Sequence, residues 1–90
     1  MYAARAALAT VQHRWTEAER DFETAVEIDR RYGLPWDEAR TLYKWALMTR
    51  AWGGASARDR AREQLGAALT LFERTGARRD AEKVRAALAC

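Results

Sequence analysis

The chain has 90 residues, of which 16 are Lys or Arg and 13 are Asp or Glu, so the net charge is +3 and the core of this one small domain must be modest. It contains neither an apolar run of roughly 18 residues nor the pattern of a secretion signal, and its one cysteine, Cys90, excludes an intramolecular disulfide. We therefore expect a soluble cytoplasmic protein with uneven charge: residues 1–38 carry 5 basic and 8 acidic groups, and residues 39–90 carry 11 and 5.

Helix-forming residues dominate the chain from its first segment onward. Apolar spacing predicts five helices, over residues 2–12, 15–32, 36–52, 56–75 and 79–89. Gly33 supplies a left-handed end to the second helix, and Pro35 prevents that helix from continuing. Gly53 and Gly54 end the third helix, and Gly76 ends the fourth. The fold class is therefore all-α.

The third predicted helix is apolar on two adjoining sides. The broader side contains Ala39, Leu42, Tyr43, Ala46 and Leu47. The other contains Trp45, Thr49 and Trp52. We expect both sides to pack, one against a neighbouring helix and the other against a further helix or a partner.

Part of the sequence repeats after 43 residues. The matching pairs are Ala18/Ala61, Phe22/Leu65, Ala25/Ala68, Arg31/Arg74, Gly33/Gly76 and Asp37/Asp80. A period of this length on helical sequence is typical of stacked helical hairpins. The pattern predicts one domain over residues 1–90, made of units 1–33 and 34–76 and a half unit 77–90, so that about two and a half antiparallel hairpins form a right-handed stack cut within its third unit.

The spacing of small and large residues in the second and fourth helices resembles that of the tetratricopeptide repeat. In each, two alanines flank a bulky residue, as in Ala18, Phe22 and Ala25. Leu42 followed by Ala46 fits the first helix of the same repeat. The period of 43 residues exceeds the usual length of about 34. The resemblance implies a stack of helical hairpins that binds other proteins.

Residues Leu71 to Leu88 resemble a second, narrower group of proteins. This stretch is similar to the repeat arms of large bacterial signal-transducing ATPases, including maltose-activator-like transcriptional regulators. It is also similar to the tails of some bacterial nucleotide cyclases. This resemblance implies a module for protein binding or self-association inside a larger bacterial regulator of transcription or signalling. It transfers no catalytic residue, because no ATPase or cyclase motif lies in the chain.

Tryptophans are the sharpest candidates for a binding surface, since aromatic residues often anchor partners. Trp45 and Trp52 lie seven residues apart, with Met48 between them and Trp36 at the start of the same helix. Packing within the array is the competing explanation for these side chains. On the fifth helix we expect Val84 and Leu88 to stay partly uncovered, favouring a homodimer or contact with neighbouring repeats of a larger chain.

The sequence offers little that is typical of catalysis or of cofactor binding. His13 has no Cys, Asp or Glu within three residues, and Ser56 is explained as a helix cap. Gly53 and Gly54 are not followed by a phosphate-binding Gly-Lys-Ser/Thr. Acidic residues near the start of the second helix repel one another mildly, and a basic neighbour would relieve this repulsion. We expect no enzyme activity, no metal, no cofactor, no membrane contact and no small-molecule substrate.

The function we expect is protein binding or self-association, and two alternatives remain open. One is a nucleic-acid-binding domain that uses the Arg-rich second half. Its candidate residues are Arg58, Arg60, Arg62, Arg74, Arg78 and Arg79. They are disfavoured because their spacing places them on different faces and no aromatic residues alternate with them. The weaker alternative is a helical bundle that holds a ligand between its tryptophans.

Overall fold

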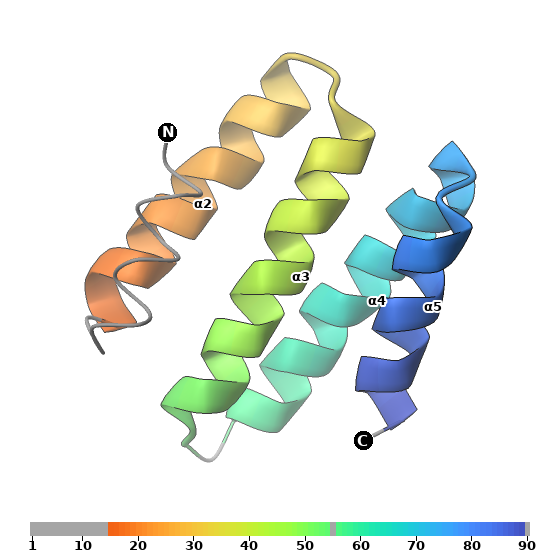
Figure 1. Cartoon of the computed structure of the whole chain (residues 1–90). Coiled ribbons are helices and arrows are strands. Elements are labelled where there is room, and N and C mark those ends of the chain that lie inside the picture. Colours follow the sequence, from red (N-terminus) through yellow and green to blue (C-terminus); the bar gives the residue numbers. More distant parts are fainter. Residues whose placement is uncertain (1–14, 55, 90) are drawn as a thin grey trace.

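The computed structural model describes residues 15–54 and 56–89, which form four helices and no strand. The helices are α2 (Trp15–Arg31), α3 (Pro35–Trp52), α4 (Ala57–Thr75) and α5 (Arg78–Ala89), and Figure 1 shows them in this order. Each bound lies within one residue of the predicted one. The all-helical prediction is thus confirmed for the described part of the chain. The predicted helix over residues 2–12, His13 and Cys90 lie outside it.

The turns after α2 and α4 have the same backbone hydrogen bonds. Gly33 and Gly76 both have positive φ, 63° and 76°, and their N–H groups donate to Arg30 and Glu73 carbonyls, both at 3.2 Å. The next residues, Leu34 and Ala77, donate to carbonyls five residues earlier, both at 2.9 Å. This pair of bonds is the Schellman arrangement, in which a left-handed residue satisfies the last carbonyls of a helix. The repeat in the sequence is therefore also a repeat in turn geometry.

The connection between α3 and α4 is built differently. Gly53 and Gly54 both have positive φ, 81° and 105°, as expected for residues that end the helix. Ser56 stands at the N-cap of α4, as predicted, but its hydroxyl makes no cap hydrogen bond; its carbonyl accepts the Arg60 N–H at 3.0 Å. This turn therefore has no counterpart in the other two.

The repeated small and large residues make up the core of the packing. Each of the six side chains in the two apolar triplets is less than a tenth exposed, which confirms the predicted stripes; they are Ala18, Phe22, Ala25, Ala61, Leu65 and Ala68. Val26, next to Ala25, is buried as well. Asp29 stays partly buried because its Oδ2 accepts a hydrogen bond from the Thr41 hydroxyl at 3.1 Å. Small residues allow close approach of the helices, and the bulky ones fill the grooves.

Side-chain contacts join the N-terminal ends of helices that lie one repeat apart. Arg60 near the start of α4 pairs with Glu19 near the start of α2. Trp36 at the start of α3 donates to Asp80 at the start of α5, at 3.0 Å. Toward the other end of α3, Arg50 donates to the carbonyl of Ala87, at 3.2 Å. α3 and α5 therefore run parallel beside each other, while consecutive helices are antiparallel (Figure 1).

None of the described helices is long and apolar enough to cross a membrane.

Candidate functional site

The side of α3 that carries the predicted tryptophans faces α2. Trp45 packs against Phe22 with ring centroids 6.3 Å apart and planes 10° apart. Met48 is 1% exposed and belongs to the same cluster as Ala18 and Phe22. The prediction that Trp45 and Met48 form part of an accessible binding stripe is therefore wrong. Their side chains fill the interface between α2 and α3.

Trp52 lies on that same side of α3, one turn beyond Met48. Its ring stacks on Trp15 of α2, with centroids 6.3 Å and planes 14° apart, and the residue is still 40% exposed. Trp52 thus contacts α2 and remains partly accessible to solvent. It lies apart from Trp36, which stands on the other side of the helix, so the four predicted residues of α3 do not form one surface.

α5 differs from the prediction at Val84. That side chain is fully buried, in a cluster with Phe72, Ala81 and residues of α3. Val84 turns inward because α5 packs along α4 and beside α3, so its apolar side is already covered. Leu88 packs against the same cluster and is partly uncovered, as predicted. The expected uncovered apolar face, and with it this argument for a homodimer, is not present in the described residues.

The accessible side of α3 carries a different set of residues. We define the α3 face as Trp36, Arg40, Lys44, Leu47 and Arg50, spaced at i, i+4, i+8, i+11 and i+14, so that all lie along one side of the helix. Leu47 is 42% exposed and Trp36 is 39% exposed. The prediction that Leu47 belongs to the packing side is wrong, because α2, α4 and α5 take up the other sides of α3.

Trp36 is held in place by two contacts on this face. Its Nε1–H donates to Asp80 of α5, and the Arg40 guanidinium lies 5.4 Å from the centroid of its ring. Such a cation over an indole ring is attracted by the negative face of the π system. A large exposed side chain with a fixed orientation loses little entropy when a partner covers it. Of the six predicted binding residues, Trp36 and Trp52 both stay about two-fifths exposed, and Trp36 is the one that lies on the α3 face.

α5 extends the α3 face with further positive charge. Arg79 and Lys83 lie 43 residues after Trp36 and Arg40, and both are exposed. Because α3 and α5 are parallel and begin side by side, residues one repeat apart point to the same side of the molecule. Periodicity alone could have found this extension, since the repeat that matches the scaffold also aligns these two residues with the face.

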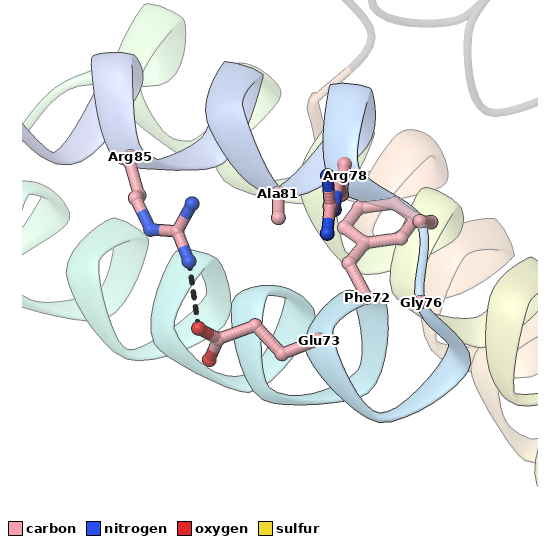
Figure 2. Close-up of a pocket in the computed structure, with 7 residues that line it drawn as sticks. Phe72, Glu73, Gly76, Arg78, Ala81 and Arg85 are labelled. Carbon is pink, nitrogen blue, oxygen red and sulfur yellow. Dashed lines mark hydrogen bonds and ion pairs between the residues drawn. The ribbon is translucent and has the colours of Figure 1, made fainter.

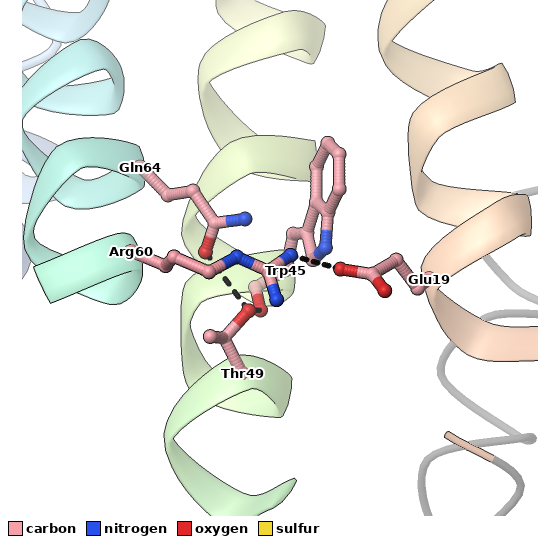
Figure 3. A network of polar contacts seen from close by, with 5 residues as sticks. All are labelled: Glu19, Trp45, Thr49, Arg60 and Gln64. Atoms are coloured by element: carbon pink, nitrogen blue, oxygen red, sulfur yellow. Dashed lines mark hydrogen bonds and ion pairs between the residues drawn. The ribbon is translucent and has the colours of Figure 1, made fainter. Parts of the chain in front are cut away.

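A polar network joins α2, α3 and α4 on the side of α3 that carries Trp45 (Figure 3). Arg60 of α4 reaches past Trp45 to the Glu19 carboxylate, which supplies the basic neighbour expected for the acidic start of α2. The Thr49 hydroxyl lies 3.0 Å from both the Trp45 carbonyl oxygen and Gln64 Oε1. Within the described part of the chain, the buried indole N–H of Trp45 has no hydrogen-bond partner. The network connects both units rather than forming an open site.

The predicted arginine candidates for nucleic-acid binding do not gather on one surface. Arg58, Arg60 and Arg62 lie at the start of α4, whereas Arg74 lies at its end and Arg78 and Arg79 lie beyond it. The rise of a helix separates Arg58 from Arg74 by about 24 Å. Arg60 is moreover neutralised by Glu19. A phosphate backbone requires several free cations on one surface, and this set does not provide it.

A hollow of about 290 Å³ lies at the turn between α4 and α5 (Figure 2). Phe72, Ala77 and Ala81 give it an apolar floor, and Arg78, Arg85 and Glu73 stand at its rim. Arg85 pairs with Glu73 at 2.7 Å, so the rim is partly neutralised. No hydroxyl, thiol or imidazole lines this hollow, and its residues supply no nucleophile with a neighbouring base.

One carboxyl group in the described residues has a shifted pKa. Burial raises the pKa of Asp29 above its ordinary value, the hydrogen bond from Thr41 lowers it, and the charges of Asp37 and Glu38 raise it further. Asp29 lies between α2 and α3, away from the α3 face. Over residues 15–54 and 56–89, no group of three or more His, Cys, Asp or Glu side chains is placed to hold a metal ion.

Comparisons with protein-family models, with curated proteins and with solved structures found no match to this chain. The assignment of a function therefore rests on the residues and their geometry.

Proposed function

We propose that the protein is a non-catalytic protein-binding module, a TPR-like stack of helical hairpins that presents the α3 face to its partner. The observation that supports this most is the α3 face itself. Exposed Trp36 and Leu47 lie on one side of a helix whose other sides are packed. Aromatic and large aliphatic side chains in such a position are the usual anchors of protein interfaces.

The repeated geometry supports the stacked architecture. The turns at Gly33 and Gly76 share their hydrogen bonds, and helices one unit apart are tied by Arg60–Glu19 and by Trp36–Asp80. Residues joined in this way are 41 and 44 positions apart, close to the period of the sequence repeat. In repeat proteins each unit contacts its neighbours in the same manner, and successive first helices line one surface. α3 and α5 would be those first helices here.

The likeness of residues Leu71 to Leu88 to the repeat arms of bacterial regulators extends this proposal. We place the module within a larger cytoplasmic regulator, where it would bind a protein or neighbouring repeats of its own chain. Self-association through α5 has lost its main support, because Val84 is buried. Sedimentation over a range of concentrations distinguishes binding of another protein from self-association. A monomer at all concentrations agrees with binding of a different protein. A dimer that Leu47→Ala dissociates would show instead that the α3 face mediates self-association.

A peptide array tests the proposal directly. The full chain is applied to immobilised peptides of varied sequence, alongside Leu47→Ala and the matched control Leu34→Ala. Leu34 is 43% exposed, nearly the same as Leu47, and lies at the α2–α3 turn, where Ala77 occupies the corresponding position of the second unit. We expect discrete peptides to bind, with Leu47→Ala losing them and Leu34→Ala keeping them. Binding that neither substitution changes would contradict the α3 face as the site.

A further inference from the structure

The surface made by α3 and α5 gathers positive charges that have no acidic partner among the described residues on one side of the molecule. The ion pairs between described residues, Arg30 with Glu38, Arg60 with Glu19 and Arg85 with Glu73, involve none of these charges. On the α3 face and its continuation, Lys44, Arg79 and Lys83 form no ion pair with any described residue, and Arg40 lies over an indole ring. The charge of this face is thus left to be neutralised by solvent or by a partner.

The charges surround an apolar centre. Leu47 lies one turn after Lys44 and two turns after Arg40, and Trp36 extends the apolar strip toward the start of the helix. From Trp36 to Arg50 the face is about 21 Å long, given the rise of an α-helix. That length accommodates about four turns of a partner helix or six to seven residues of an extended segment at roughly 3.3 Å each.

We propose that the α3 face binds an acidic, amphipathic segment of another protein. Its large apolar side chains would cover Leu47 and Trp36, and flanking Asp or Glu residues would pair with Arg40, Lys44, Arg79 and Lys83. This inference rests on the proposed function and specifies its partner. Positive charge at the rim of the face would steer such a segment and fix its orientation, while the apolar centre would supply most of the affinity.

The same geometry disfavours nucleic acid as the occupant. A base would stack on an open aromatic ring, but one side of the Trp36 ring faces Arg40 at 5.4 Å. The indole N–H is already bound to Asp80, whose carboxylate therefore lies beside Trp36. That carboxylate would repel phosphates. Leu47, at the middle of the face, offers neither a charge nor a stacking plane.

Fluorescence anisotropy with defined peptides tests the inference. The probe is a labelled 15-residue helix-forming peptide with Leu at every third or fourth position and Glu at the flanking ones, a length of about four turns. A version with Gln in place of each Glu, and labelled single-stranded and duplex DNA, serve as comparisons. We expect the Glu peptide to bind at least tenfold more tightly than the Gln peptide, with affinity falling as salt is raised.

Variants then locate the binding. We expect Lys44→Glu with Lys83→Glu to weaken the Glu peptide at least tenfold, and Leu47→Ala to weaken it about threefold to tenfold. Arg62→Glu on the outer side of α4 and Leu34→Ala are controls that should bind as the unchanged chain does. Circular dichroism confirms that each variant remains folded.

The outcomes separate this inference from the function on which it rests. If the Gln peptide binds as tightly as the Glu peptide and Leu47→Ala weakens both, the acidic partner is wrong while protein binding stands. If no peptide on the array or in solution binds through Leu47, both are wrong. If DNA binds and the double lysine variant abolishes that binding, the face is a nucleic-acid surface and the inference is overturned.

Discussion

The buried and the accessible parts of the molecule differ in whether they repeat. The apolar triplets of α2 and α4 repeat from one unit to the next, whereas the α3 face largely does not. The triplets repeat after 43 residues, and all six of their side chains are buried. On the α3 face, Trp36 and Arg40 are replaced one unit later by Arg79 and Lys83, so only the positive charge at one position is kept. The buried contacts repeat because each hairpin must meet the next in the same way. The accessible face is free of that requirement, and it is there that we propose a partner is selected.

Two identical leucine substitutions give the largest expected contrast. Leu65 is 1% exposed and Leu47 is 42% exposed, so Leu65→Ala leaves a cavity and Leu47→Ala does not. We expect Leu65→Ala to lower the free energy of unfolding by about 3 kcal/mol and Leu47→Ala to change it by less than about 0.5 kcal/mol. Urea unfolding followed by circular dichroism measures both. Equal losses of unfolding free energy in the two variants would show that Leu47 is a core residue. The α3 face could then not be a binding surface.

The turns of the repeated scaffold give the next largest effect. Gly33 and Gly76 have left-handed φ values, and a Cβ at either would meet nothing within 4 Å. The cost of Gly33→Ala or Gly76→Ala is therefore backbone strain alone, about 1 kcal/mol in each case. Because the two turns share their hydrogen bonds, we expect the two losses to be similar in urea unfolding. A loss at one turn only would mean that the units are not equivalent.

Replacing Gly66 by alanine should raise the stability rather than lower it, and so serves as a control for the two turn glycines. It lies inside α4 with an ordinary helical backbone, and a Cβ there would also meet nothing within 4 Å. Alanine is the better helix former, so Gly66→Ala should raise the free energy of unfolding by about 0.5–1 kcal/mol. Thermal unfolding should show a higher midpoint for this variant. A lower midpoint would show that α4 packs against something that the small residue accommodates.

The smallest effect concerns Asp29, a polar residue on an otherwise apolar stripe. Its pKa is raised by burial, so the folded chain holds the proton more tightly than the unfolded chain does. The stabilisation from that proton is complete at low pH and is lost as the pH rises through the pKa of the folded state. Asp29→Asn keeps an acceptor for Thr41 without the charge.

We therefore expect Asp29→Asn to be more stable than the unchanged chain at neutral pH, by less than the gain from Gly66→Ala. The difference should shrink as the pH falls through the raised pKa of Asp29. Urea unfolding at neutral and acidic pH measures it, with Asp59→Asn in the exposed first turn of α4 as the control. An advantage for Asp29→Asn that grows on acidification would contradict the direction of the shift.

Much of the scaffold could be predicted because its signals are local. Positive φ at Gly33 and Gly76 follows from the residue type, and the helix bounds follow from apolar spacing and breaks. The candidate site could be predicted only in part. The sequence predicts Trp36 as a binding residue, and it is accessible, but it also predicts Met48 and Val84, which are buried. The sequence places Leu47 on the packing side of its helix, whereas the structure exposes it.

The reason lies in α3, which has apolar residues around most of its circumference and so does not show from its own sequence which side faces solvent. By itself the sequence determined the four described helices, their ends and the small and large residues that repeat along them, since these depend on neighbours three to five residues away or on residue types that fit only one backbone conformation. The tertiary structure decided that Trp45 and Met48 meet α2, that Val84 is covered, and that Trp36 and Leu47 stay open. Those outcomes depend on where three other helices lie around α3, which no local pattern specifies.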